Sequence, residues 1–175
     1  VAQNELGDSA AALSNVASPF PPACAGTVSL TNMGADAVGA LTIAVKSGLF
    51  NADVHQDLIA VSFTDGVVRV LLNDGVGNFT AGDAVAVGSQ PRAVTVGDYD
   101  EDGDLDAAVV NSASNTVTLL LGDNTGALVA QATTLTTAAT PYDIGTGDFN
   151  EDTHPDLVVV NNGGVGQFFL GDGAG

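Results

Sequence analysis

From residue 41 onward, short apolar stretches alternate with polar loops in a repeated order. Each unit opens with an apolar stretch that predicts a first strand, at residues 41–45, 93–96 and 142–145. After an acidic loop comes a second, strongly apolar stretch, at residues 58–61, 107–110 and 157–160. A polar turn leads to a third, at residues 67–72, 117–121 and 167–170. The second stretches contain no polar positions, which predicts strands that are covered on both faces.

The acidic loops start at residues 49, 98 and 148, so the pattern recurs every 49 or 50 residues. A fourth, more polar strand is expected near residues 84–87 and 133–136. Four antiparallel strands per unit, with covered inner strands, predict an all-β fold of β-propeller blades. A closed ring needs roughly four to eight blades, so about three blades indicate a part of a larger propeller.

These units define the expected domain organisation. Residues 1–40 are interpreted as an irregular N-terminal segment or as the outer strand of a preceding blade. Residues 41–90 form a first blade repeat, residues 91–140 a second, and residues 141–175 a third, incomplete one. Further blades would come from the same longer chain or from other copies.

The loop from Asp98 to Asp106 has carboxylates at its first, third, fifth, seventh and ninth positions, with Gly103 at the sixth. Oxygen ligands at alternate residues and a glycine at the sharp turn are what a loop around a hard cation requires, and calcium accepts six to eight oxygens. An EF-hand is excluded, because the twelfth position of an EF-hand loop is acidic and a helix follows that loop. Here the twelfth position is Val109, inside an apolar stretch that predicts a strand.

Two further loops repeat this pattern less completely. The later copy has Thr153 in place of the glycine, and its candidate ligand positions are Asp148, Asn150, Asp152, His154 and Asp156. The earlier copy begins with Leu49, and its weaker candidates are Asn51, Asp53, His55 and Asp57. We expect this earlier loop to keep its shape and to bind calcium weakly or not at all.

The chain of 175 residues carries 21 acidic and 3 basic side chains, a formal net charge of -18. Nucleic acid and anionic membranes are therefore unfavourable partners. No apolar run is long enough for membrane insertion. Bound calcium or a saline habitat would each account for such acidity.

Cys24 is the single cysteine, which excludes an internal disulfide. Calcium loops favour an extracellular location, secreted or at the cell surface.

The segments Gly97-Asp-Tyr-Asp-Glu-Asp-Gly-Asp-Leu-Asp106 and Gly147-Asp-Phe-Asn-Glu-Asp-Thr-His-Pro-Asp156 resemble the FG-GAP/VCBS repeats. These repeats occur in the propellers of integrin α-subunits and in many secreted bacterial and fungal proteins, including lectins. The resemblance implies that each loop joins the first two strands of a blade and holds a structural calcium ion, at about two sites. It implies one ligand set of Asp98, Asp100, Asp102, Asp106 and the Asp104 carbonyl, and another of Asp148, Asn150, Asp152, Asp156 and the His154 carbonyl.

The resulting hypothesis is an extracellular, calcium-stabilised β-propeller module for binding or adhesion, with a protein or a glycan as ligand. No catalytic constellation is recognisable in the sequence, so we expect no enzymatic activity. Two alternatives stay open. One is the catalytic or non-catalytic propeller of a polysaccharide-active enzyme. The other is a structural subunit whose incomplete propellers assemble into a polymer.

Overall fold

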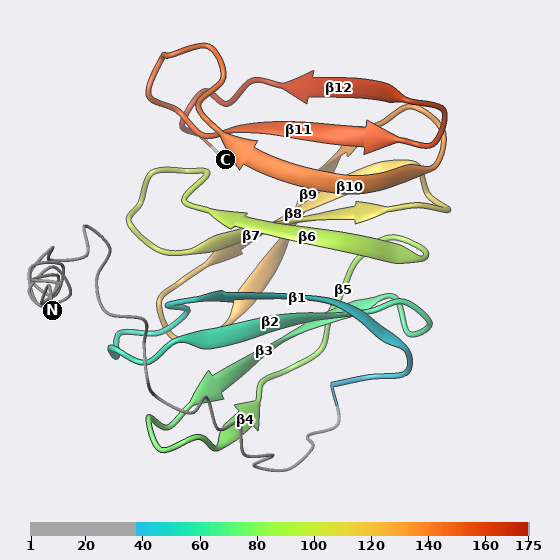
Figure 1. The fold of residues 1–175 in the computed structure, drawn as a ribbon. Coiled ribbons are helices and arrows are strands. Elements are labelled where there is room, and N and C mark those ends of the chain that lie inside the picture. Colours follow the sequence, from blue (N-terminus) through green and yellow to red (C-terminus); the bar gives the residue numbers. More distant parts are fainter. Residues whose placement is uncertain (1–37, 175) are drawn as a thin grey trace, which may run out of the picture. The chain divides into compact units, whose positions relative to one another are not determined.

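The computed structural model describes residues 38–174, and every regular element in that part of the chain is a β-strand (Figure 1). The strands form three antiparallel sheets in chain order. The first sheet contains β1 (Thr42–Gly48), β2 (Asp57–Ser62), β3 (Val67–Asn73), β4 (Phe79–Ala81) and β5 (Val85–Ala86). The second contains β6 (Pro91–Gly97), β7 (Asp106–Asn111), β8 (Thr116–Gly122) and β9 (Leu128–Thr136). The third contains β10 (Pro141–Gly147), β11 (Asp156–Asn161) and β12 (Val165–Phe169). The predicted all-β class is confirmed, and each sheet is one blade.

The register of the first two strands is the same in every sheet. The last residue of the first strand pairs with the aspartate that opens the second, in Gly48↔Asp57, Gly97↔Asp106 and Gly147↔Asp156. Each acidic loop therefore connects two paired strands at their common end. All three loops lie at the same end of the strands, on the left in Figure 1.

The entry to each first strand also repeats. Leu41, Gln90 and Thr140 have left-handed backbone angles, with φ of 56°, 54° and 55°. A shift in strand register follows each of them, at the start of β1, β6 and β10. Leu41 was expected inside the first strand, but β1 begins one residue later. Leu41 lies at the end of the loop that precedes β1. Its left-handed backbone explains the difference, because a residue in this conformation cannot continue an extended strand.

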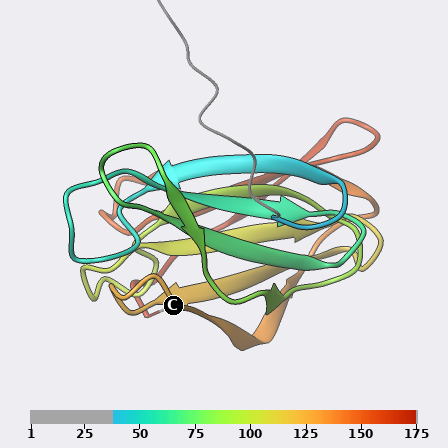
Figure 2. The same cartoon turned by 90° about the horizontal axis from the view of Figure 1, so that it is seen from below.

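Two apolar clusters fill the spaces between the sheets. One lies between the first and second sheets and includes Ile59, Val68 and Val109. The other lies between the second and third sheets and includes Val110 and Val159. Figure 2 shows these sheets stacked behind one another. All six residues of β7 are buried, which confirms that this second strand is covered on both faces.

The third sheet differs from this expectation. Val159 on β11 is fully buried in the cluster shared with the second sheet. Val160, the next residue, faces the opposite way and is 47% exposed. The prediction of cover on both faces is therefore wrong for β11 within the described residues.

The fourth strands also differ in detail from the prediction. In the first sheet the expected strand is divided into β4 and β5, which both pair with β3. The chain leaves the ladder around Gly82, whose N–H still donates to the Val70 carbonyl at 2.8 Å. Glycine is a poor strand former, which accounts for the break. In the second sheet, β9 is longer than expected and begins at Leu128.

The strands fall within the predicted repeats: β1–β5 in residues 41–90, β6–β9 in 91–140 and β10–β12 in 141–175. The predicted N-terminal segment 1–40 lies outside the described residues, apart from its last three. No helix within residues 38–174 is long and apolar enough to cross a membrane.

Candidate functional site

The loop between β6 and β7 brings three carboxylates together. Asp98, Asp100 and Asp106 each offer one carboxylate oxygen, and these oxygens lie within 4.8 Å of one another. Among the described residues this is the single group of three or more potential metal ligands at such a spacing. Carboxylates this close repel one another, and a hard cation between them would remove the repulsion.

Asp98 supplies a second sign that this loop is built for a cation. Its Oδ2 accepts a hydrogen bond from the Gly103 N–H at 3.1 Å. Its Oδ1 is buried and has no hydrogen-bond partner among the described residues. A buried, unpaired carboxylate oxygen is costly. The residues present therefore fit calcium, which would supply the missing partner.

Asp102 and Asp104 take a different part in this loop. The Asp102 N–H donates to Asp100 Oδ1 at 3.4 Å, and the Asp104 N–H donates to Asp102 Oδ1 at 2.8 Å. The Asp102 carboxylate is not in the three-residue group. Desolvation, together with the nearby charges of Asp102, Asp123, Asp98 and Asp100, raises the pKa of the Asp104 carboxyl. The predicted roles of Asp102 as a ligand and of Asp104 through its carbonyl stay predictions.

Two left-handed residues shape the loop. Glu101 has φ of 58° and Gly103 has φ of 94°. A Cβ on Gly103 would meet no atom within 4 Å, so the backbone angle alone explains the glycine. The equivalent residues in the last loop, Glu151 and Thr153, have φ of 63° and 80°. Thr153 therefore holds a conformation that is unfavourable for a β-branched residue.

The ninth-position aspartate has a structural role that the sequence reasoning missed. Asp106 is fully buried, and its two oxygens accept the N–H groups of Tyr99 at 2.7 Å and Gly122 at 2.8 Å. Its carboxylate thus joins the second position of the loop to the end of the third strand. Burial raises its pKa, while these two hydrogen bonds act in the opposite direction. The signal in the sequence was an aspartate directly before each buried strand.

The other two sheets contain the same clamp. Asp57 bonds the N–H groups of Phe50 at 3.0 Å and Asn73 at 2.8 Å. Asp156 bonds those of Phe149 and Gly171, both at 2.8 Å. Both carboxylates are fully buried. Each oxygen retains a lone pair for a metal, so the predicted ligand role is compatible with the clamp.

The loop between β10 and β11 is held mainly by its own hydrogen bonds. Asp148 accepts the N–H groups of Asp152 at 3.1 Å and Thr153 at 2.9 Å. The Asn150 amide donates to Asp152 Oδ2 at 2.7 Å, and the His154 N–H donates to Asp152 Oδ1 at 3.0 Å. The predicted ligands are thus close in one loop, although their carboxylates do not form a compact three-residue group.

The loop between β1 and β2 keeps part of this geometry. The Asp53 N–H donates to Asn51 Oδ1 at 3.1 Å, and the His55 N–H donates to Asp53 Oδ1 at 2.7 Å. However, its fourth and sixth residues, Ala52 and Val54, are not left-handed. Leu49 has no carboxylate to accept the sixth N–H. The expectation that this loop keeps its shape is therefore correct for its third, fifth and seventh positions and for the clamp at Asp57, and wrong for its fourth and sixth positions.

One ion pair connects two loops. His154 Nδ1 contacts Glu101 Oε1, which joins the loop of the third sheet to that of the second. The hydrogen bond to Glu101 raises the pKa of the His154 imidazole. His55 instead lies against Gly75 of its own sheet. The two histidines therefore contact different partners, although they occupy the same position in their loops.

A sequence model of the FG-GAP-like repeat matches residues 50–109 and 104–159. The chain belongs to the FG-GAP-like repeat family. Each match of this family runs from one acidic loop to the second strand of the following blade. No curated protein matches the chain. The resemblance to FG-GAP repeats that the acidic loops indicated is confirmed.

Proposed function

We propose that this FG-GAP-like repeat protein is an extracellular binding or adhesion module whose blades are stabilised by calcium. The observation that carries the proposal is the group formed by Asp98, Asp100 and Asp106, with the unpaired buried oxygen of Asp98 beside it. Asp98 and Asp100 come from the loop, and Asp106 opens β7. An ion held by all three would fasten the loop to the sheet.

The location of the loops favours a structural role for calcium. All three loops connect first to second strands at one end of the sheets (Figure 1). Within residues 38–174, the opposite end and the inner strands are then available to contact a ligand, either a protein or a glycan. The calcium concentration outside cells suits sites of modest affinity, with dissociation constants of about 0.1–1 mM. We therefore propose a secreted or cell-surface location and a binding rather than a catalytic role.

Calorimetric titration of the EDTA-treated chain with calcium tests the proposal. We expect about two sites, and a stabilisation of about 2.7 kcal/mol for each site at calcium concentrations one hundred times the dissociation constant. Asp98→Asn should remove one site. Asp83→Asn, the same change at an exposed position outside the loops, should remove none. Absence of binding and of thermal stabilisation in the wild-type chain would contradict the proposal.

The free edge of β12 favours assembly as a second candidate function. β3 pairs with β4 and β5, and β8 pairs with β9, but β12 pairs with β11 alone among the described strands. Val165 and Phe168 on β12 are 55% and 61% exposed. An unpaired strand edge with apolar side chains favours pairing with another chain. The occupant would be a strand from further blades or from another copy.

Light scattering over a range of concentrations tests assembly. If β12 pairs between copies, the average mass rises with concentration, and Val165→Lys suppresses the rise because a charged edge resists pairing. Val76→Lys, in an exposed turn outside the sheet edge, should leave the rise intact. A constant monomer mass at every concentration would exclude assembly through this edge.

A further inference from the structure

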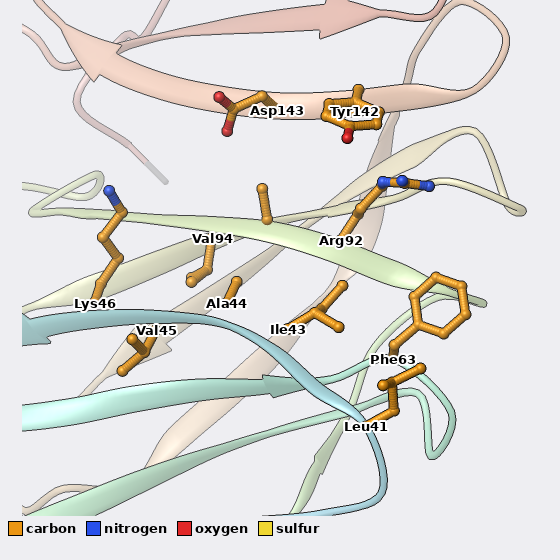
Figure 3. Close-up of a pocket in the computed structure, with 11 residues that line it drawn as sticks. Leu41, Ile43, Ala44, Val45, Lys46, Phe63, Arg92, Val94, Tyr142 and Asp143 are labelled. Carbon is orange, nitrogen blue, oxygen red and sulfur yellow. The ribbon is translucent and has the colours of Figure 1, made fainter.

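The first strands of the three sheets line an open cleft. It is lined by residues of β1, β6 and β10, together with Leu41 and Phe63, and has a volume of about 690 Å³ (Figure 3). This volume is typical of small-molecule sites. The cleft lies along the inner strands, away from the acidic loops at the strand ends.

Basic side chains are concentrated in this cleft. The chain has 3 of them in total against 21 acidic ones. Two of the three, Lys46 from β1 and Arg92 from β6, line the cleft. The third, Arg69, donates to the Gly82 carbonyl at 2.9 Å instead. The local balance of charge in the cleft is thus opposite to that of the whole chain.

Neither cation in the cleft is neutralised. Within residues 38–174, Lys46 and Arg92 form no ion pair with a carboxylate. Asp143 is the acidic residue in the lining, and its Oδ1 accepts the Ile144 N–H at 2.9 Å. In so acidic a chain, surface cations would readily find carboxylate partners. Two unpaired cations in one cleft therefore indicate a site for an anionic group.

Tyr142 holds Arg92 in place. The guanidinium carbon lies 4.2 Å from the centre of the Tyr142 ring, across the space between β6 and β10 (Figure 3). This cation–π contact orients the guanidinium and leaves its N–H groups available. Tyr142 itself is 55% exposed, and Ile43 nearby is 41% exposed. The cations are thus bordered by apolar surface.

We infer that this cleft binds a sugar acid: a glycan end or monosaccharide with a single carboxylate. Arg92 would bind the carboxylate through charge-assisted hydrogen bonds, whereas Lys46, at the opposite end of the cleft in Figure 3, would favour an anionic ligand through its charge alone. Tyr142 and Ile43 would contact the apolar faces of the ring. β1, β6 and β10 each form the edge of their sheet, so their free backbone groups would bind hydroxyls. The net charge of -18 repels polyanions, which restricts the ligand to a low charge.

The inference rests on the proposed binding function and specifies its ligand. Titration calorimetry with D-glucuronate, on the full chain at saturating calcium, tests it. D-Glucose is the uncharged control. We expect glucuronate to bind at least about tenfold more tightly than glucose, since each lost charged contact is worth about a factor of ten or more.

Three variants test the inference, because two of the basic residues line the cleft and the third lies outside it. Arg92→Gln should weaken glucuronate binding about tenfold and Lys46→Gln should weaken it less, whereas Arg69→Gln, with the same change of charge outside the cleft, should not weaken it. Equal affinity for glucose and glucuronate, an equal loss in Arg69→Gln, or binding of a capped acidic peptide in preference to glucuronate would overturn the inference. Calcium binding and stabilisation measured on the same samples report separately on the proposed function, so its failure is distinguishable.

Discussion

Asp106 and Gly122, sixteen residues apart, are joined by a hydrogen bond of 2.8 Å from the Gly122 N–H to a fully buried carboxylate oxygen. The other oxygen of Asp106 accepts the Tyr99 N–H at 2.7 Å. The same arrangement recurs at Asp57 and Asp156. The ninth-position aspartate is therefore a clamp between the loop and the end of the third strand.

Asp106→Asn should destabilise the chain even without calcium. The amide has one acceptor oxygen, so one buried N–H loses its partner. A hydrogen bond to a charged group contributes about 1.5–3 kcal/mol, and we expect a loss of this size in urea unfolding measured in EDTA. Asp100→Asn is the matched control and should change stability little in EDTA. A similar loss in both variants would contradict a special role for the clamp.

Asp104→Asn should stabilise the calcium-free chain in a pH-dependent way. The pKa of Asp104 is raised above the ordinary value of 3.8 by desolvation and by the neighbouring carboxylates. The contribution of Asp104 to the stability of the folded chain is thus fully present below pH 3.8, where its carboxyl is protonated. This contribution is lost as the pH rises through the raised pKa. The neutral asparagine avoids this loss.

The difference in melting temperature between Asp104→Asn and the wild type, in EDTA, should therefore be near zero at low pH and grow toward neutral pH. Saturating calcium should reduce or reverse the difference, because the ion favours the charged carboxylate. A difference that does not change with pH would argue against charge crowding in this loop.

Thr153→Gly should stabilise the last loop. Thr153 has φ of 80°, a conformation that costs a β-branched residue about 1–3 kcal/mol. Glycine removes this strain but loses more entropy on folding, by about 1 kcal/mol, so we expect a net gain of about 1 kcal/mol. Gly103→Thr, the opposite exchange in the equivalent position, should destabilise. Thermal unfolding gives the change in stability of both variants. A change of the same sign in both would refute backbone strain at Thr153 as the explanation.

The Glu101–His154 pair should make stability depend on pH near neutrality. The hydrogen bond to Glu101 raises the pKa of His154 above 6.5. Its stabilising contribution is therefore present below 6.5 and is lost as pH rises through the raised pKa. Glu101→Gln should remove this dependence in melting curves recorded between about pH 5.5 and pH 8.5, a range that spans the imidazole titration. An unchanged pH profile in Glu101→Gln would show that the pair does not act in solution.

The repeated order of strands was predictable because its signals are local. A glycine, an acidic loop and an apolar run of about four residues follow one another in each unit, so the positions of β2, β7 and β11 could be read directly. The period near 50 residues then gave the number of sheets. The grouping of Asp98 and Asp100 also follows from their spacing within one turn.

Other features depend on contacts between distant residues. The clamp at Asp106 needs the N–H of Gly122, whose approach is decided by the pairing of β7 with β8. Gln90 and Thr140 are not glycines, so nothing in their residue type announces a left-handed backbone. The cleft could not be foreseen either, because Lys46, Arg92 and Tyr142 come from three different sheets.

The aspartate clamp is present even in the blade whose acidic loop lacks the first carboxylate. In the first blade Leu49 occupies the place of the first ligand, yet Asp57 still ties Phe50 to Asn73. A unit with an incomplete acidic loop can therefore keep its loop and strands tied together, and an array can combine complete and incomplete loops. Under the proposed calcium binding, the ion would therefore adjust the stability of single blades and would not be an all-or-none requirement for folding.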